Sequence, residues 1–200
     1  MRYVPNKHRR RSIRLRGHDY SQTGAYFITI CTHDRQCQFG KIIDGEMMLN
    51  EYGKIVADEW INTSKIRTGI ELDIWVVMPN HFHGIVVITR RGTARRAPTT
   101  CRAPAREQFG KPVAGSLSTI VRAFKSAVTK RINETRHTPG EKIWQRNYWE
   151  HIVRDENEWQ RIQQYILSNP AKWEMDRNYP GDPSTVRETT AEYGHEPWMV

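Results

Sequence analysis

The order of strands and helices expected from this 200-residue chain indicates an α+β fold with a β-α-β-β-α-β core. Two observations carry this prediction. Apolar, β-branched segments of strand length alternate with segments whose apolar residues recur at helical spacing. Two of the strands also follow one another with only a tight turn between them. Such an order gives an antiparallel sheet with helices on one face, which is the ferredoxin-like arrangement. The length suffices for one domain with a substantial core.

The first half of the chain is expected to form a strand, a hairpin and a helix. Residues 25–32 are rich in β-branched and aromatic side chains, which favour a strand. The pair Asp44-Gly45 separates two short segments and is typical of the turn of a small hairpin. Asn50 is expected to cap a helix, and Gly69 to mark its end.

The second half is expected to add three strands and two helices. The strands are predicted at residues 70–78, at 81–88 and within 143–153. The first helix begins at Ser116 and carries a continuous apolar stripe formed by Leu117, Ile120, Val121, Phe124, Val128 and Ile132. Asp155 caps the last helix, with Glu158 in the capping-box position. That helix should end near Asn169, because Pro170 disfavours helix at the residue before it.

Positive charge is concentrated in two segments. The net charge is +9; residues 1–16 hold seven Lys/Arg and no acid, and residues 90–111 hold seven Lys/Arg and Glu107. We therefore expect a basic N-terminal arm at 1–19 and a flexible basic insert at 89–112. Such segments can be solvated linkers, but two of them flanking a near-neutral body are typical of phosphate binding.

The domain itself is expected to span residues 20–173. Residues 174–200 hold six acids and two arginines and predict an acidic tail that is largely unpacked or lies loosely across the basic surface. No apolar run is long enough to span a membrane. The three cysteines match no zinc-binding spacing and are interpreted as reduced thiols, which favours a cytoplasmic protein.

Two histidines open the strand at 81–88. Side chains alternate across a strand, so His81 and His83 share one face while Phe82 takes the other. Such a pair can simply face solvent, but two neutral imidazoles side by side can also bind one metal ion. A histidine-triad hydrolase would need a third histidine at position 85, which is Ile85, so that class is excluded.

The last helix supplies a second pair of polar side chains. Tyr165 and Asn169 are four residues apart and therefore lie one above the other on the same face. Tyr165 could be an amphipathic packing residue and Asn169 a helix terminus. However, both flank the apolar stripe, so both can reach the sheet where His81 and His83 lie.

These segments together resemble the single-tyrosine HUH transposases, and among them the REP-associated tyrosine transposases. The resemblance extends roughly from Arg9 to Trp173. The matching segments are Gly24-Ala25-Tyr26-Phe27-Ile28-Thr29, Val77-Met78-Pro79-Asn80-His81-Phe82-His83-Gly84, Trp144-Gln145-Arg146-Asn147-Tyr148 and Tyr165-Ile166-Leu167-Ser168-Asn169-Pro170.

The resemblance implies a role for each of these polar residues. His81 and His83 would bind a divalent metal, Mg²⁺ or Mn²⁺, and Asn169 would complete the metal site. Tyr165 would be the nucleophile in the cleavage and rejoining of single-stranded, hairpin-containing DNA through a 5′-phosphotyrosine intermediate. The smaller insertion-sequence transposases carry Gln at the last position, whereas Asn169 matches the REP-associated group. The basic insert and the acidic tail depart from a minimal member and leave DNA specificity and regulation open.

The implied partner is single-stranded DNA with palindromic repeat hairpins, bound by a monomer or homodimer that associates with the nucleoid. We expect the DNA to contact Arg9, Arg10, Arg11, Arg14, Arg16, Arg122, Lys125, Trp144 and Tyr148. The alternative is a non-catalytic protein, derived from such an enzyme, that binds single-stranded DNA or RNA hairpins. A covalent protein–DNA adduct distinguishes the two.

Overall fold

A computed structural model of the chain describes residues 18–89 and 113–181. Within these ranges the elements are, in chain order, β1 (Gly24–Cys31), η1 (His33–Arg35), β2 (Gly40–Ile43), β3 (Glu46–Leu49), α1 (Glu51–Lys65), β4 (Ile70–Val77), β5 (His81–Ile88), α2 (Leu117–Thr135), β6 (Trp149–Val153), α3 (Glu156–Ser168) and η2 (Pro170–Met175).

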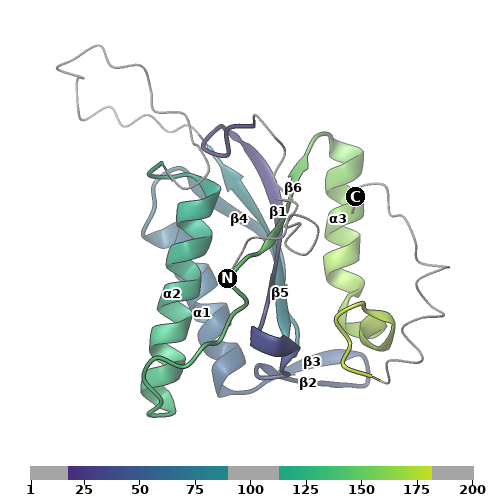
Figure 1. The fold of residues 1–200 in the computed structure, drawn as a ribbon. Helices are drawn as coiled ribbons and strands as arrows, with labels where there is room; N and C mark the ends of the chain where they lie inside the picture. The colour runs from purple at the N-terminus through teal and green to yellow at the C-terminus, as the bar shows by residue number, and fades with distance from the viewer. Residues whose placement is uncertain (1–17, 90–112, 182–200) are drawn as a thin grey trace, which may run out of the picture.

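Four strands form one antiparallel sheet in the order β4-β5-β1-β6 (Figure 1). β1 and β5 are therefore the two central strands. With α1 between β1 and β4 and α2 between β5 and β6, this order is the predicted ferredoxin-like core. The hairpin of β2 and β3 forms a separate two-stranded sheet, inserted between β1 and α1.

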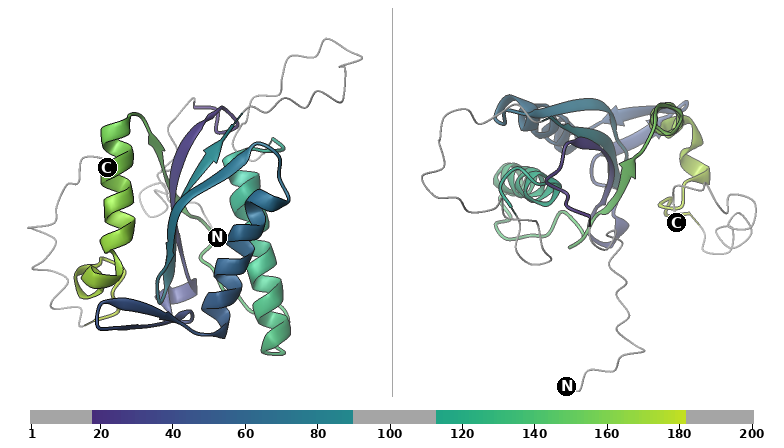
Figure 2. Two further views of the ribbon diagram at one scale, coloured as in Figure 1. Left: turned by 180° about the vertical axis from the view of Figure 1, so that it is seen from behind. Right: turned by 90° about the horizontal axis from the view of Figure 1, so that it is seen from above.

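The helices lie on both faces of the sheet (Figure 2). α1 and α2, the two helices of the core, pack side by side on one face, as predicted. α3, which follows the β-α-β-β-α-β core, covers the opposite face, where the histidine pair lies. The apolar stripe of a helix shows which side of the helix is buried, but not which face of the sheet receives it.

Two hydrophobic cores result from this arrangement, and β1 contributes to both. Tyr26, Ile28 and Ile30 face α1 and α2, where the predicted α2 stripe is buried throughout. Phe27 and the β5 residue Ile85 face α3 and pack against its buried side chains. A strand covered on both faces reads as a continuous apolar run, as β1 does.

The helix N-termini follow the predicted caps with one difference. Asn50 caps α1, and Asp155 accepts a hydrogen bond from the Glu158 backbone N–H (2.8 Å). The Glu158 carboxylate does not return to the cap residue. It accepts instead from the Arg154 backbone N–H (2.7 Å) and from His151 Nε2 (2.8 Å). The capping contact is thus displaced by one residue, and it ties the start of α3 to β6.

The strand predicted within 143–153 is β6, and Trp144 forms a single bridge with Thr32. One predicted boundary needs correction. The chain after Trp173 remains packed, because Asn178 is 3% exposed and its carbonyl accepts a hydrogen bond from Asn80 Nδ2 (2.7 Å). An unpacked tail beginning at residue 174 is therefore wrong for its first residues, whereas 182–200 lie outside the described part.

Across the described ranges, no helix combines the length and apolar character that crossing a membrane requires. The predicted arm residues 1–17 and the insert residues 90–112 are not described.

Gly84 should tolerate no side chain, although it lies in a regular strand. A Cβ there would come within 2.9 Å of Phe82 Cε1 and 3.0 Å of Trp60 Cζ2, both buried. Gly84→Ala is expected to lower the free energy of unfolding by about 1–3 kcal/mol, as overpacking does, measured by urea denaturation. The matched control is Gly24→Ala in β1, where the nearest atom is 3.7 Å away. Equal stability of the two variants would contradict the close approach at Gly84.

Candidate functional site

The site lies on the sheet face covered by α3. His81 and His83 are buried, with exposed fractions of 0% and 1%. Their rings lie edge to face, with the ring centroids 4.5 Å apart. Phe82 points the other way and packs against Trp60 in the core beneath α1 and α2. The predicted separation of the two faces of β5 is therefore present, but the imidazoles face a second protein layer rather than solvent.

Hydrogen bonds determine which nitrogen of His81 is available. The Asn80 amide donates from Nδ2 to the carbonyls of Arg35 (3.0 Å) and Asn178 (2.7 Å), so its oxygen must act as an acceptor. His81 Nδ1 lies 2.9 Å from that oxygen and therefore carries the proton. His81 Nε2 is left with its lone pair, and it is buried without a hydrogen-bond partner among the described residues.

His83 is oriented by β1 and by α3. Its Nδ1 lies 2.8 Å from Thr29 Oγ1, the residue directly across the β1–β5 ladder. Its Nε2 lies 3.4 Å from the Tyr165 hydroxyl. A proton on Nδ1 donated to Thr29 leaves Nε2 as an acceptor, which is the state that a metal ligand also needs.

α3 carries Tyr165 and Asn169 one turn apart, as the sequence predicts, and is fastened to β4 by Asp73. One carboxylate oxygen of Asp73 accepts from Trp159 Nε1 (2.6 Å) and from Gln163 Nε2 (2.7 Å), which fixes α3 relative to the sheet. Asn169 is buried, and its side-chain oxygen has no hydrogen-bond partner in the described part of the chain.

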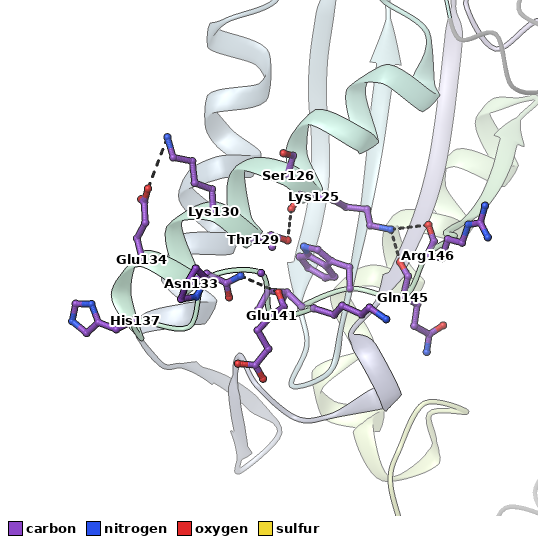
Figure 3. Close-up of a pocket in the computed structure, with 15 residues that line it drawn as sticks. Lys125, Ser126, Thr129, Lys130, Asn133, Glu134, His137, Glu141, Gln145 and Arg146 are labelled. Atoms are coloured by element: carbon purple, nitrogen blue, oxygen red, sulfur yellow. Dashed lines mark hydrogen bonds and ion pairs between the residues drawn. The ribbon is translucent and has the colours of Figure 1, made fainter.

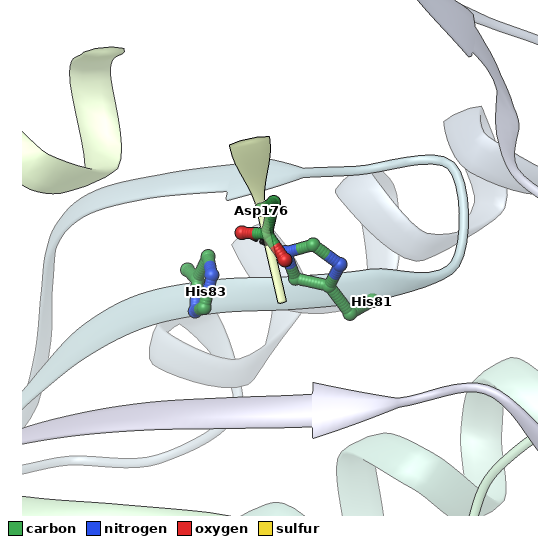
Figure 4. A group of neighbouring side chains, drawn as sticks. All are labelled: His81, His83 and Asp176. Atoms are coloured by element: carbon green, nitrogen blue, oxygen red, sulfur yellow. Dashed lines mark ion pairs between the residues drawn. The ribbon is translucent and has the colours of Figure 1, made fainter. Parts of the chain in front are cut away.

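Sequence reasoning missed one residue of the site, Asp176, which it assigned to the unpacked tail. Its carboxylate lies between the two imidazoles (Figure 4), 3.9 Å from His81 Nε2 and 3.4 Å from Asn169 Nδ2. The ligand atoms of His81, His83 and Asp176 all lie within 4.8 Å of one another. The only sequence signal was an acid seven residues after Asn169, beyond the end of every periodic pattern.

Burial dominates the electrostatics of this cluster. It lowers the pKa of His81 to about 4, although the nearby Asp176 carboxylate opposes that change. The pKa of His83 is lowered well below its usual value by burial and by the neighbouring His81. Burial raises the pKa of Tyr165, and Asp176 raises it further, while Arg177 has the opposite effect. At neutral pH the site thus holds two neutral imidazoles and a protonated phenol.

The cluster fits a divalent metal ion. Two neutral imidazole nitrogens, a carboxylate oxygen and an amide oxygen form a donor set compatible with Mg²⁺ or Mn²⁺. Two of these atoms, His81 Nε2 and Asn169 Oδ1, are buried without partners among the described residues, and a buried polar atom of this kind is costly. A metal ion would satisfy both.

The residues predicted to contact DNA have different surroundings. Arg122 is exposed on α2, and Tyr148 is partly buried against the core. Trp144 is 7% exposed and packs against Phe39. Lys125 Nζ donates to the backbone carbonyl of Gln145 (2.6 Å) and to those of the next two residues. Arg9, Arg10, Arg11, Arg14 and Arg16 lie outside the described residues.

Comparisons with known proteins place this geometry in context. No family model matches the chain. An uncharacterised protein of Haemophilus influenzae is 39% identical over 179 residues, which cover 89% of this chain and 97% of that protein. The solved structure of a REP-associated tyrosine transposase bound to a REP hairpin aligns with a TM-score of 0.53 and 21% identity, covering 80% of this chain and 73% of its own.

A candidate transposase of Deinococcus radiodurans aligns with a TM-score of 0.39 and 20% identity, over 77% of this chain and 95% of its own. That similarity is too low to add to the argument. The REP-associated transposase shares the fold of this chain, which agrees with the α+β architecture described above.

The metal-free protein should lose stability as pH falls from 6.5 towards 4. In the folded state His81 stays neutral until about pH 4, whereas in the unfolded chain it titrates near 6.5. Between these pH values the unfolded chain binds more protons than the folded protein. The free energy of unfolding is therefore highest above pH 6.5 and falls by about 3 kcal/mol once the pH is below the folded-state pKa of His81. Urea denaturation in chelator at several pH values measures it.

The His81→Gln variant should show a shallower dependence of stability on pH than the wild-type protein. If His81→Gln kept the wild-type slope, the neutral buried state of His81 would be wrong.

Proposed function

The chain belongs to one family with the uncharacterised Haemophilus influenzae protein, and we propose that it is a transposase-type DNA strand transferase of the single-tyrosine HUH kind. It cleaves and rejoins single-stranded DNA that contains a hairpin, through a 5′-phosphotyrosine intermediate. The observation that carries this proposal is the Tyr165 hydroxyl, 3.4 Å from Nε2 of a buried histidine pair. The shared fold with the REP-associated tyrosine transposase supports it.

His81, His83, Asn169 and Asp176 would hold the metal ion. When bound, Mg²⁺ or Mn²⁺ polarises the scissile phosphate and offsets the negative charge that gathers there. The sequence predicted three metal ligands, and Asp176 would add a carboxylate as the fourth. Asn80 and Thr29 act indirectly, because each engages Nδ1 of one imidazole and so leaves Nε2 directed into the site.

Tyr165 acts as the nucleophile. Its hydroxyl lies 3.4 Å from His83 Nε2, the same nitrogen that would bind a metal ion, so the nucleophile would stand directly beside the phosphate-binding ion. The phenol oxygen attacks phosphorus, loses its proton, and displaces the 3′ oxygen, which leaves as a hydroxyl after taking up a proton. The phosphodiester bond is exchanged rather than hydrolysed, so a 3′ hydroxyl can later reverse the step without an external energy source.

Single-stranded DNA suits this chemistry, because its flexible backbone can bring a single linkage to Tyr165. The REP-associated transposase was solved with a REP hairpin, and we propose a palindromic hairpin with single-stranded flanks for this chain as well. The proposal places the protein in the cytoplasm, on the nucleoid when bound to DNA. A non-catalytic hairpin-binding protein is the competing function; it does not require a tyrosine beside the histidine pair.

Tyr165→Phe should abolish the covalent adduct. The wild-type protein is incubated with Mn²⁺ and a panel of 3′-labelled hairpins with single-stranded flanks, because the tyrosine stays on the 5′ phosphate of the downstream fragment. A labelled band of protein size on a denaturing gel is the expected result. The variant should lose it by a factor on the order of 10⁴ or more, with hairpin affinity nearly unchanged because only one oxygen is removed.

Tyr148→Phe is the control. Tyr148 precedes α3 and is partly buried against the core beneath α1 and α2, whereas Tyr165 lies within α3. It should still form the adduct. A trapped adduct that maps to a peptide without Tyr165 would refute the assignment, and tight hairpin binding without any adduct would favour the non-catalytic function.

Metal affinity should depend on Asp176. Titration of the protein with Mn²⁺, followed by the electron paramagnetic resonance signal of the free ion, measures binding without DNA. Asp176→Ala and His81→Ala should each weaken Mn²⁺ binding by at least about tenfold. Asp34→Ala, which removes an acid that is 73% exposed, is the matched control and should bind as the wild type does. Unchanged Mn²⁺ affinity in Asp176→Ala would remove that carboxylate from the metal site.

A further inference from the structure

A groove lies on the face of the sheet that α2 covers, away from the histidine pair, and nothing in the proposed chemistry uses it. It runs between α2 and the segment 139–146, and we call it the α2 groove. Its volume is about 990 Å³. Figure 3 shows Gln145 and Arg146 at one end, His137 and Glu134 at the other, and Asn133 between them.

Two buried polar atoms in the groove wall lack partners. Asn133 is 7% exposed; its Nδ2 donates to the Glu141 carbonyl (2.9 Å), while its oxygen has no hydrogen-bond partner within the described ranges. Trp144 is also 7% exposed, and its Nε1 likewise lacks an acceptor there. A buried polar atom without a partner is unfavourable, so a ligand that supplies the partner gains affinity. Asn133 supplies an acceptor from α2 and Trp144 supplies a donor from the facing segment, and the edge of a nucleobase carries both kinds of group.

The groove is positively charged at its rim. Of its two acids, Glu134 pairs with Lys130 (3.9 Å) and Glu141 with Arg136 (3.0 Å). Lys142 and Arg146 are exposed and form no ion pair with any described residue. Their charge is therefore available to bind phosphate groups. Contacts between phosphates and lysine or arginine side chains supply much of the affinity in nucleic-acid complexes.

Lys125 holds the wall in place rather than contacting a ligand. Its Nζ donates to three successive carbonyls, those of Gln145, Arg146 and Asn147. Burial lowers the pKa of Lys125 to about 8. The groove is thus built from an ordered segment, so a nucleotide that enters it meets a preformed surface.

The groove also ends close to the histidine pair. The Gln145 N–H donates to the Cys31 carbonyl (2.9 Å), and Cys31 pairs directly with His81 across the β1–β5 ladder. A single strand that passes around this end of the sheet can therefore occupy both places.

We propose that the α2 groove binds one unpaired nucleotide of the single-stranded DNA substrate, at a position away from the cleaved linkage. The base enters towards Asn133 and Trp144, and the flanking phosphates lie on Lys142 and Arg146. This proposal rests on the function proposed above, because the occupant of the groove is the single-stranded DNA that the transferase would cleave.

The test measures DNA binding without cleavage, by fluorescence anisotropy in chelator with the Tyr165→Phe protein. The probes are a labelled dT20 and a 20-mer phosphodiester strand that is abasic throughout. Lys142→Glu together with Arg146→Glu should weaken dT20 binding at least about tenfold and lower the slope of log K against log salt by about 0.7 for each lost contact. The control, Lys54→Glu with Lys65→Glu on α1, makes the same charge change at exposed positions outside the groove and should have a much smaller effect.

Base insertion is tested separately with Trp144→Phe, which keeps the aromatic ring and removes the Nε1 donor. The preference for dT20 over the abasic strand should fall about three- to tenfold. A dT20 strand containing 5-iododeoxyuridine should crosslink to the tryptic peptide Ile143–Arg146 on irradiation.

Equal losses in the groove and α1 charge variants, or crosslinks confined to other peptides, would overturn the proposal. An unchanged base preference in Trp144→Phe would show that only phosphate is bound. These outcomes do not depend on whether the wild-type protein forms a covalent adduct, so failure of the groove and failure of the transferase proposal are distinguishable.

Discussion

The register between β1 and β5 determines the site. It pairs Thr29 with His83 and Cys31 with His81, so the hydroxyl that orients one imidazole is supplied by the residue directly opposite. A shift of this strand by one residue would exchange the two faces: Phe82 would enter the polar cluster and both imidazoles would enter the core beneath α1 and α2. The close fit of Phe82 and Trp60 over Gly84 opposes such a shift, because the core leaves no room for another arrangement.

Asn80 extends this control to distant parts of the chain. It is fully buried in the turn between β4 and β5 and bonds at once to His81, to η1 through the Arg35 carbonyl, and to the C-terminal segment through Asn178. The Asn178 N–H in turn donates to the Asp176 carboxylate (2.6 Å). One amide therefore couples the tautomer of a histidine to the position of the only carboxylate in the cluster, and loss of either contact would disturb both.

The sequence predicted those parts of the molecule that repeat a pattern. The α2 stripe, the cap at Asn50 and the alternation along His81–Ile88 follow from helical and strand periodicity, which is a local property. The position of Asp176 is not local, because it depends on contacts between segments far apart in the chain. The burial of Trp144 against Phe39 is a long-range contact of the same kind, which no local pattern indicates.

The charge distribution separates two tasks on the two faces of the sheet. The face beneath α3 holds neutral imidazoles, a phenol whose pKa is raised, and one carboxylate, whereas the α2 groove has unpaired cations at its rim. A phosphate that approaches Asp176 in the metal-free state meets a like charge in a poorly solvated space, which is strongly unfavourable. Under the proposed function, a bound divalent cation would offset both negative charges, so DNA would engage the site together with the metal ion. Binding in the groove has no such requirement, because its cations already face solvent. Under the two proposals, the α2 groove would hold a DNA strand on one face of the sheet before the site on the other face binds its metal ion.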